Sequence, residues 1–259
     1  MKEIWLERMT YEEAAEFAKT GAIVMLPLSP LEAHGPHLPL GVDFFGAVTL
    51  AEQSATLLNR QNVKTVIAPV LPYALADVAM PFAGTVTLRA KTLQAVVSDI
   101  AQSFKAHGFK GLVIVCQHLE RANLKAMQET ASDLSGAHMP AIMANPFFTH
   151  AETMNAMMKG EFPALDLHAG EWETAFCLWL YPKLVKMEIL KTLPPNWVNL
   201  REKLYEQGCR DFVEAGGEKC YFGDPSKGTP ELGKKIYEGL AKVLADEVLG
   251  WVQNWPKGN

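Results

Sequence analysis

Short apolar runs alternate with stretches of helical periodicity along the chain. The runs have the length of buried strands and are rich in Val, Ile and Leu, and they cover residues 22–28, 63–71, 111–117 and 139–145. Around them, apolar residues recur three and four positions apart, which predicts helices over residues 11–20, 45–59, 92–107, 122–136, 170–181 and 230–251. This order predicts a layered α/β fold with a mainly parallel central sheet.

Local signals add detail to this pattern. Thr10 and Glu13 have the spacing of a capping box, so we expect the first helix to begin there, and Gly21 is a natural end for it. Residues 84–88, GTVTL, alternate between apolar and polar positions and predict a further strand. Residues 188–228 have no sustained periodicity and predict loops over one face.

The composition is that of a globular protein. The chain has 259 residues, of which 49% are hydrophobic and 20% charged. This length fits one α/β domain, so we expect a single domain over residues 1–259. The formal charge is −5 and no long basic run occurs, so we expect a small-molecule substrate and neither nucleic acid nor a membrane as partner.

The cysteines and the N-terminal residues favour the cytoplasm. Cys116, Cys177, Cys209 and Cys220 are widely spaced and form no CxxC pair, which is typical of reduced thiols. The first residues lack the apolar core and cleavage site of a secretory signal. No apolar run approaches the roughly 20 residues of a membrane-spanning helix. We therefore expect a soluble, cytoplasmic protein.

Titratable residues gather where the first predicted strand ends. The stretch LPLSPLEAHGPHLPLGVD, residues 26–43, holds Glu32, His34, His37 and Asp43 among four prolines and two glycines. In an extended backbone, side chains two residues apart point the same way, so Glu32 and His34 can present an oxygen and a nitrogen to one side. Asp43 follows across a loop stiffened by proline and can supply a further ligand.

A second pair follows the third predicted strand. The stretch CQHLERAN places His118 and Glu120 two residues apart, directly after the apolar run GLVIV. In open parallel sheets, ligands bind in the crevice beyond the carboxyl ends of the strands, so we expect both pairs to face it. One such pair occurs often by chance, but two pairs after two buried runs indicate a metal site.

Two imidazoles and three carboxylates suit a pair of borderline divalent ions. We expect two ions, Zn²⁺ or Mn²⁺ with Fe²⁺ also compatible, and the carboxylate of Asp43 as their bridge. Such a pair would lower the pKa of a shared water by several units and supply a hydroxide nucleophile at neutral pH. The predicted ligands are Glu32, His34, Asp43, His118 and Glu120.

The stretch DLHAGEWETA supplies a candidate proton donor. His168 precedes a glycine at which the backbone can approach closely, and Glu173 follows five residues later at the start of a predicted helix. A His oriented by a carboxylate can protonate a leaving nitrogen, so we assign both residues to proton transfer. The positive end of the helix is by itself a sufficient reason for the acids Glu171 and Glu173.

Two other residues of these motifs have alternative interpretations. His37 could add a ligand, but His34 already completes the spacing, so we favour a loop residue whose ring hydrogen-bonds to the backbone. Trp172 recurs with Phe176 and Trp179 at helical spacing, which is typical of core packing. Its place near the proposed acid could also let Trp172 wall a small substrate.

These motifs together resemble the creatininase (creatinine amidohydrolase) family. LPLSPLEAHGPHLPLGVD is similar to that family's signature LPxGSxEQHGPHLPLxTD, and HAGEWETA is similar to its HAGxxETS box. FGDPSKGTPELG is similar to its C-terminal GDPxxAT…G segment. The motifs occur in the same order and span residues 26–233.

The resemblance implies a three-layer α/β/α fold, two divalent ions, and hydrolysis of a C–N bond in a cyclic or otherwise small amide. It also implies a homo-oligomer, commonly a hexamer. At matching positions it implies the same site residues, namely the ligands Glu32, His34, Asp43, His118 and Glu120, and the proton-transfer residues His168 and Glu173.

The substrate wall departs from the family pattern. The tryptophan that closes over creatinine in that family has no equivalent here, since Ala164 stands at the corresponding place in EFPALDLHAG. The stretch DVAMPFAGT lacks a His that lines the pocket in relatives. We therefore expect a substrate other than creatinine.

Three functions fit these residues. The leading hypothesis is a dinuclear metal hydrolase that cleaves a C–N bond in a small cyclic amide, lactam or formamide. A second uses the same ions as Lewis acids for ring opening or isomerisation of a sugar-like or keto substrate. A third, of another class, is a metal-stabilised oligomeric protein without catalysis. It ranks lowest, because a structural site has no need for a proton donor such as His168.

Overall fold

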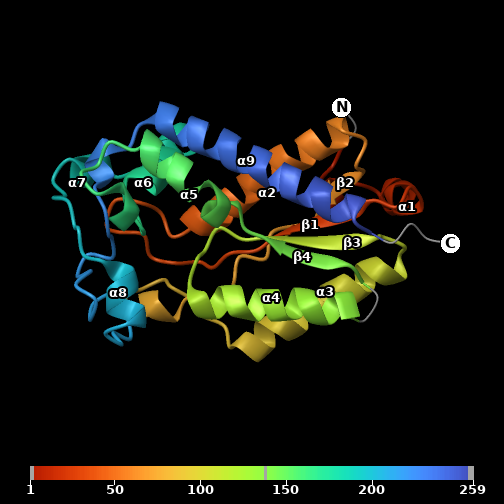
Figure 1. The fold of residues 1–259 in the computed structure, drawn as a ribbon, viewed down its shortest axis with the longest axis horizontal. Coiled ribbons are helices and arrows are strands. Elements are labelled where there is room, and N and C mark those ends of the chain that lie inside the picture. The colour runs from red at the N-terminus through yellow and green to blue at the C-terminus, as the bar shows by residue number, and fades with distance from the viewer. Residues whose placement is uncertain (1–2, 137–138, 256–259) are drawn as a thin grey trace.

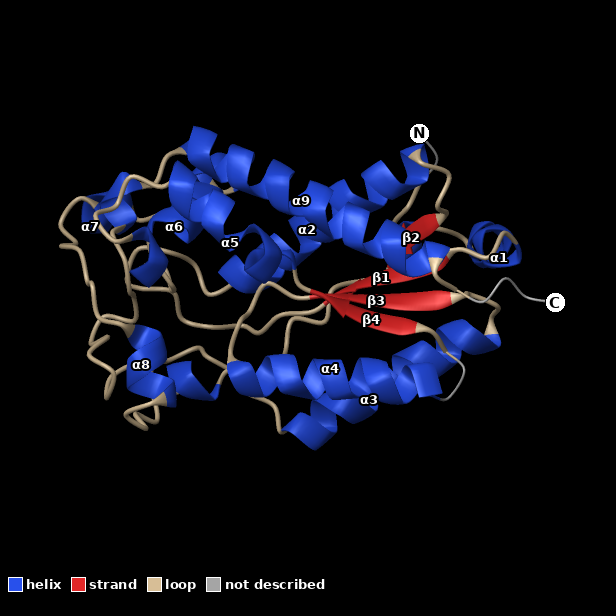
Figure 2. Ribbon diagram, viewed as in Figure 1, coloured by secondary structure: helices blue, strands red, loops and turns tan. Residues whose placement is uncertain are grey.

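Four parallel strands form the centre of the molecule, as Figure 2 shows. The structure is a computed structural model that describes residues 3–136 and 139–255. The spatial order of the strands is β2-β1-β3-β4. Their bounds are β1 Ile23–Pro27, β2 Thr65–Ile67, β3 Gly111–Val115 and β4 Ala141–Ala144. Each strand lies within one of the four predicted apolar runs, so the predicted parallel sheet is confirmed.

Helices cover both faces of this sheet. They are α1 Tyr11–Lys19, α2 Val42–Arg60, α3 Ala90–Ala106, α4 Arg121–Gly136, α5 Pro146–Met157, α6 Glu171–Leu180, α7 Met187–Leu190, α8 Leu200–Tyr205 and α9 Pro230–Gln253. Short 3-10 helices lie at Leu6–Arg8, Asp77–Ala79, Pro163–Leu165, Pro182–Leu184 and Pro225–Lys227. Figure 1 shows α3 and α4 on one side of the sheet and α2 and α9 on the other, which is the α/β/α layering expected from the sequence.

Alternate strand residues build two separate cores. Successive side chains of a strand point to opposite faces of the sheet. Ile23 and Met25 of β1 pack in the core formed with α2 and α9, whereas Val24 and Leu26 pack in the core formed with α1, α3 and α4. Because both faces are buried, the strands are continuous apolar runs, and polar groups can collect only at the edge where the strands end.

The segment predicted to be irregular packs over the carboxyl edge of the sheet. Its helices α7 and α8 are short, and Leu200, Phe212 and Phe222 form a third apolar cluster with Ala33. Figure 1 shows α7 and α8 beyond the arrowheads of the strands. These loops enclose the edge at which the polar motifs lie.

The local signals of the sequence have mixed outcomes. The capping box is confirmed, since Thr10 accepts the backbone N–H of Glu13 and the Glu13 carboxylate accepts that of Thr10. The strand predicted over residues 84–88 is wrong. Only Thr87 forms an isolated bridge there, to Ala74, because this segment runs beside another loop and not beside a sheet edge.

Two helices differ from the prediction. Helix α2 begins at Val42, three residues before the predicted start, so Asp43 lies in its first turn instead of in the preceding loop. Helix α5 is absent from the prediction. Asn145 caps it by accepting the backbone N–H of Phe147, and Pro146 occupies its first position, both of which are ordinary helix-start signals.

The cysteines are unpaired. Cys116, Cys177, Cys209 and Cys220 are all free thiols, which confirms the prediction that they form no disulfide frame. Within the part of the chain that the structure describes, no helix is both long enough and apolar enough to cross a membrane.

Candidate metal centre

The two predicted ligand pairs leave the sheet from neighbouring strands. Glu32 and His34 follow β1, and His118 follows β3. Strands β1 and β3 pair in parallel with Pro27 opposite Val115 at their ends, so the two loops start side by side. Nδ1 of His118 lies 3.2 Å from Oε2 of Glu32, so the structure brings the two loops together.

Asp43 lies between the two histidines. It occupies the first turn of α2, where the helix dipole favours a negative charge. Its Oδ1 is 3.5 Å from Nε2 of His34, and its Oδ2 is 3.3 Å from Nδ1 of His118. One carboxylate can therefore serve two groups of ligands.

The titratable side chains form two groups that share Asp43. Each group offers three ligand atoms within 4.8 Å of one another, and every member is buried. The groups consist of Glu32, Asp43 and His118, and of His34, Asp43 and Glu173. A third combination, of Glu32, His34 and His168, overlaps both.

Glu120 lies outside the three groups, whereas Glu173 lies inside one of them. Oε2 of Glu120 lies 3.7 Å from Nε2 of His118 and accepts the backbone N–H of Val78 at 3.4 Å, outside all three groups. Its role as a ligand stays a prediction. Oε1 of Glu173 lies 3.5 Å from Nε2 of His34, within the second group, and its role in proton transfer stays a prediction.

The two acids in the first turn of α6, Glu171 and Glu173, have different partners. The carboxylate of Glu171 is fully buried and accepts the backbone N–H groups of Lys159 and Gly160, each at 2.8 Å, so it fixes the loop after α5. Oε2 of Glu173 accepts the N–H of Ala169 at 2.5 Å, which leaves its other oxygen facing His34. Only Glu173 contributes to the cluster.

The donor atoms fit divalent cations. Both carboxylate oxygens of Glu32, Oδ2 of Asp43, and Nε2 of His34 and of His118 are buried and have no hydrogen-bond partner among the described residues. Unpaired carboxylates in a protein interior are costly. Within the described chain, their ion-pair partners are the two imidazoles alone. Mixed nitrogen and oxygen ligands of this kind suit Zn²⁺ or Mn²⁺.

In the cluster, protonated imidazoles offset the negative charge of the carboxylates. Burial raises the pKa of Glu32 to about 7, although His118 opposes the shift. Burial by itself would lower the pKa of His34 and of His118, but the surrounding carboxylates hold both pKa values well above the usual range. The protons on these imidazoles supply positive charge that a bound cation would replace.

His168 lies against His34, with 4.2 Å between the ring centroids. Its Nε2 is 2.8 Å from the carbonyl oxygen of Ala33, and because a carbonyl only accepts, Nε2 carries the proton and Nδ1 has the free lone pair. Burial lowers the pKa of His168 well below its usual value, so the ring is neutral. A backbone carbonyl, and not the predicted carboxylate, orients this ring.

Cys220 shares the carbonyl that orients His168. Its Sγ donates to the Ala33 oxygen at 3.2 Å and lies 3.8 Å from Nε2 of His168. Burial raises the pKa of Cys220 to about 12, so the thiol keeps its proton at neutral pH. Sequence reasoning missed this residue, because a lone cysteine just before the FGDPSKGTPELG motif carries no signal of such a contact.

His37 and Trp172 lie in the protein interior. Nε2 of His37 is 2.9 Å from Oγ1 of Thr174, so the interpretation of a loop ring bonded to the backbone is wrong. Trp172 packs against Phe147 with ring centroids 5.4 Å apart, in agreement with the core interpretation. Neither residue is among those that line the cavity described next.

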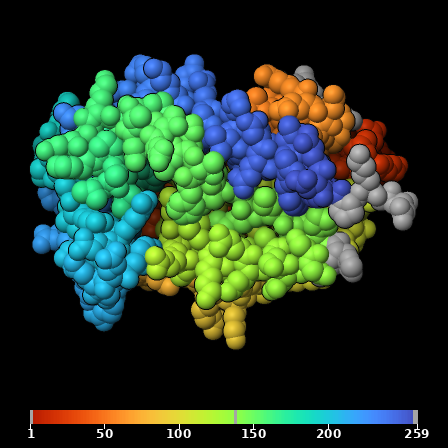
Figure 3. All heavy atoms as spheres, viewed as in Figure 1, coloured from red at the N-terminus to blue at the C-terminus, as the bar shows by residue number. Residues whose placement is uncertain are grey.

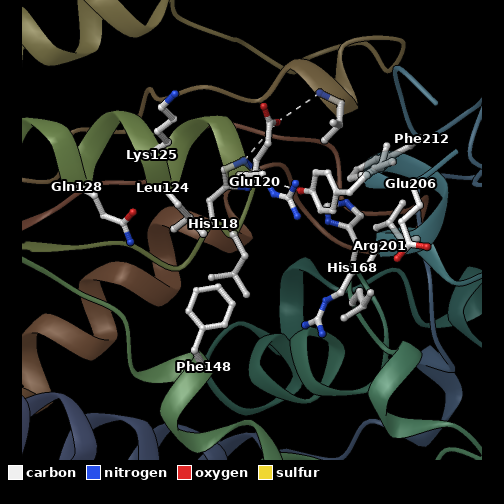
Figure 4. A pocket seen from close by; sticks show the side chains of 17 residues that line it. His118, Glu120, Leu124, Lys125, Gln128, Phe148, His168, Arg201, Glu206 and Phe212 are labelled. Carbon is white, nitrogen blue, oxygen red and sulfur yellow. Dashed lines mark hydrogen bonds and ion pairs between the residues drawn. The ribbon is translucent and has the colours of Figure 1, made fainter. Parts of the chain in front are cut away.

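A cavity of about 660 Å³ lies over one side of the cluster. His118, Glu120 and His168 line its inner end, as Figure 4 shows. Its outer walls come from α4, α8 and Phe148 of α5. Figure 3 shows the surface hollowed where the cyan segment that contains α8 meets the green segments of α4 and α5. Small-molecule sites typically have volumes of roughly 300–1,000 Å³.

The fold and the buried ligands place the chain in the class of metal-dependent α/β enzymes. The family can be stated more closely. The sequence model of the creatininase family, described as creatinine amidohydrolase, matches residues 7–248, so the chain belongs to the creatininase family. Members of this family are metal-dependent hydrolases, which argues against the hypothesis of a protein without catalysis.

Curated relatives act on different substrates. The mycofactocin precursor peptide peptidase of Mycobacterium tuberculosis is 24% identical over 250 residues, covering 92% of this chain and 89% of the relative. The creatinine amidohydrolase of Pseudomonas putida is 24% identical over 208 residues, covering 75% and 78%. The 3-dehydro-scyllo-inosose hydrolase of Thermotoga maritima is 25% identical over 189 residues, covering 71% and 58%.

Solved structures share the fold. A crystal structure of creatinine amidohydrolase superposes with a TM-score of 0.79 at 21% identity and covers 100% of both chains. A structure named Creatininase Mn has a TM-score of 0.76 at 20% identity and covers 96% of this chain and 98% of the other. A variant creatininase is described as the Zn-Zn type, with a TM-score of 0.76 at 21% identity over the same shares.

Proposed function

We propose that the chain hydrolyses a C–N bond in a small amide with two divalent ions, Zn²⁺ or Mn²⁺, bound in the cluster. The position of Asp43 carries this proposal, because its two oxygens face the histidines of two different ligand groups at 3.5 and 3.3 Å. Each group would hold one ion. The names of the manganese and Zn-Zn creatininase structures support both metals.

The ions supply Lewis-acid chemistry when bound, since they polarise a carbonyl and lower the pKa of water. His168 then moves the proton. Its Nδ1 accepts a proton from the water that adds to the amide carbon, and it passes that proton to the departing nitrogen as the C–N bond breaks. The products are a carboxylic acid and an amine, which remain parts of one molecule when the substrate is cyclic. The Ala33 carbonyl holds the ring and stabilises its positive charge between the two transfers.

The proposed substrate is a small cyclic amide, lactam or formamide other than creatinine. The cavity accepts a small molecule by its volume, and among the described residues no tryptophan lines it. This agrees with the absence of the tryptophan that closes over creatinine in the family. The three curated relatives also show that one scaffold serves several substrates.

A second candidate function is the hydrolytic ring opening of a sugar-like keto compound. The name of the Thermotoga maritima relative, a 3-dehydro-scyllo-inosose hydrolase, favours it. The same ligand groups and His168 would act on a carbonyl carbon in both reactions. The two candidates differ in the bond that breaks, C–N or C–C.

A side-by-side substrate screen tests both candidates. Protein loaded with Zn²⁺ or Mn²⁺ is incubated with lactams, cyclic amides, formamides and cyclic dehydro-sugars, and release of amine or of a ring-opened acid is measured. The proposal expects amine release that disappears in metal-stripped protein and in the His168→Ala variant. Ring opening of dehydro-sugars without amine release would favour the second candidate. Turnover that persists without metal would contradict both.

A further inference from the structure

The outer wall of the cavity is basic, although the whole chain is acidic. Arg121, Lys125 and Arg201 line it, against the single carboxylate of Glu206. Glu120 lies deeper, beside His118. The chain as a whole has a formal charge of −5, so this concentration of cations around one opening runs against the overall balance. Clefts lined by one sign of charge attract ligands of the opposite sign.

The two guanidinium groups have no carboxylate partner within the described residues. Among the ion pairs of up to 4.0 Å there, none involves Arg121 or Arg201. Arg121 lies with Cζ 3.9 Å from the ring centroid of Tyr205, which orients its planar group without neutralising it. Lys125 pairs with Glu129 at 3.8 Å on the exposed face of α4. The arginines therefore keep their donors for a ligand.

The two arginines come from two different helices, α4 and α8. Residues 121, 124, 125 and 128 form one face of α4 and line the cavity, and α8 contributes residues 200, 201, 204 and 205. Figure 4 shows Lys125 on one side of the cavity and Arg201 on the other. Because Arg121 is the first residue of the 16-residue helix α4, the positive end of that helix lies at the same wall.

Apolar side chains line the same cavity as these basic residues. They are Leu119, Leu124, Leu204 and Phe148. Phe148 is 56% exposed, so its ring is accessible to a ligand in the cavity. The cavity thus combines His118 and His168 at its inner end with apolar and cationic side chains in its walls.

We propose that the substrate is an amide that carries a carboxylate, which Arg121 and Arg201 bind at the rim while its apolar part lies against Leu124 and Phe148. This inference rests on the proposed function, because the scissile amide would lie at the cluster. The planar fork of a guanidinium binds a carboxylate with two parallel hydrogen bonds, which makes arginine a suitable residue for this rim.

Binding to matched pairs of compounds tests this inference. The probes are N-acetyl-L-phenylalanine, N-benzoylglycine and 5-oxoproline, each compared by calorimetry with its own carboxamide on metal-loaded protein. We expect each acid to bind about tenfold more tightly than its amide, because charge-assisted hydrogen bonds are the strong ones. A panel in which no acid binds more tightly than its amide overturns the inference.

Variants locate the carboxylate. In Arg121→Gln and Arg201→Gln the preference for acids should fall several-fold, and the double variant should lose it. Arg201→Lys keeps the positive charge but lacks the planar fork, so its preference for acids should lie between those of the unaltered protein and Arg201→Gln. Arg60→Gln, an exposed arginine at the end of α2, is the matched control and should keep the full preference. A preference that survives the double variant means that the acid binds the metals instead, and the rim assignment is then wrong.

This experiment separates the inference from the proposed function. Preferred binding of acids that depends on Arg121 and Arg201 supports the inference even if no C–N bond is cleaved. Cleavage of neutral amides and acids at equal efficiency would support the hydrolase and overturn the carboxylate preference.

Discussion

The buried ligand cluster beneath the cavity, which we call the floor, and the rim of the cavity are built in opposite ways. On the floor, Glu32, His34 and Asp43 are at most 2% exposed and contact one another or His118 within 3.5 Å. On the rim, Arg201 is exposed and unpaired among the described residues. The floor side chains come from the carboxyl edge of the sheet and from first helical turns, which are rigid supports. The difference agrees with our proposals, in which the floor carries out the reaction and the rim selects the substrate.

Removal of the shared carboxylate should have the largest effect. In Asp43→Ala both ligand groups lose a member, so we expect loss of bound metal and a fall in turnover of about 10³-fold or more, since metal ions supply several kcal/mol to such reactions. Elemental analysis measures the bound metal, and steady-state kinetics measure the turnover. The control is Asp99→Ala, an exposed aspartate of α3. An active, metal-loaded Asp43→Ala protein would contradict the account.

Loss of the proposed proton carrier should act on turnover alone. In His168→Ala we expect turnover to fall by about 10²–10⁴-fold, the usual contribution of general acid and base catalysis. The metal content should match that of the unaltered protein, because His168 is not required by either of the two groups that share Asp43. His107→Ala, at the exposed end of α3, is the control. A parallel loss of metal would make His168 a ligand instead.

Metal removal should destabilise the floor but leave the rim unaffected. A ligand present at about 100 times its dissociation constant stabilises a protein by about 2.7 kcal/mol. For a chain of this length, each kcal/mol of stability changes the melting temperature by about 2–4 °C. We therefore expect a chelator to lower the melting temperature by roughly 5–10 °C. Arg201→Gln should show the same drop and the same starting temperature. An unchanged melting temperature would speak against buried ions.

Cys220 should produce the smallest effects. In Cys220→Ala the Ala33 carbonyl loses one donor but keeps His168, so we expect turnover to fall less than about tenfold. Cys220→Gly removes the same donor and also the cost of a left-handed backbone, since φ is +57°. The free energy of unfolding of Cys220→Gly should therefore exceed that of Cys220→Ala by about 1 kcal/mol, and its melting temperature should be higher. Equal melting of the two variants would show that this strain is negligible.

Much of the fold could be predicted because its signals are local. Both faces of β1 and β3 are buried, so their sequences are continuous apolar runs, and Thr10 with Glu13 marks a helix start within four residues. The prediction of a strand over residues 84–88 was wrong. Alternation of apolar and polar residues is typical of a strand with one buried face, but it does not show whether a sheet edge lies beside the segment to pair with it.

The site was predictable in part. Glu32, His34 and His118 follow strands that the sequence identifies, and the carboxyl edge of a parallel sheet brings such loops together. Whether Glu120 or Glu173 completes a group depends on how α6 packs against the loop after β1, which no local pattern records. The contact of Cys220 with Ala33 joins residues 187 positions apart. Such contacts arise from tertiary packing.

Counting bound metal in four proteins tests the central claim most directly. The unaltered chain, His118→Ala, His34→Ala and Asp43→Ala are loaded with Zn²⁺ or Mn²⁺, separated from free ion and analysed for metal per chain. The account predicts about two ions per chain in the unaltered protein, about one in His118→Ala and in His34→Ala, and nearly none in Asp43→Ala. The reason is that the two groups share only Asp43. A single ion in the unaltered chain, or two ions in Asp43→Ala, would contradict it.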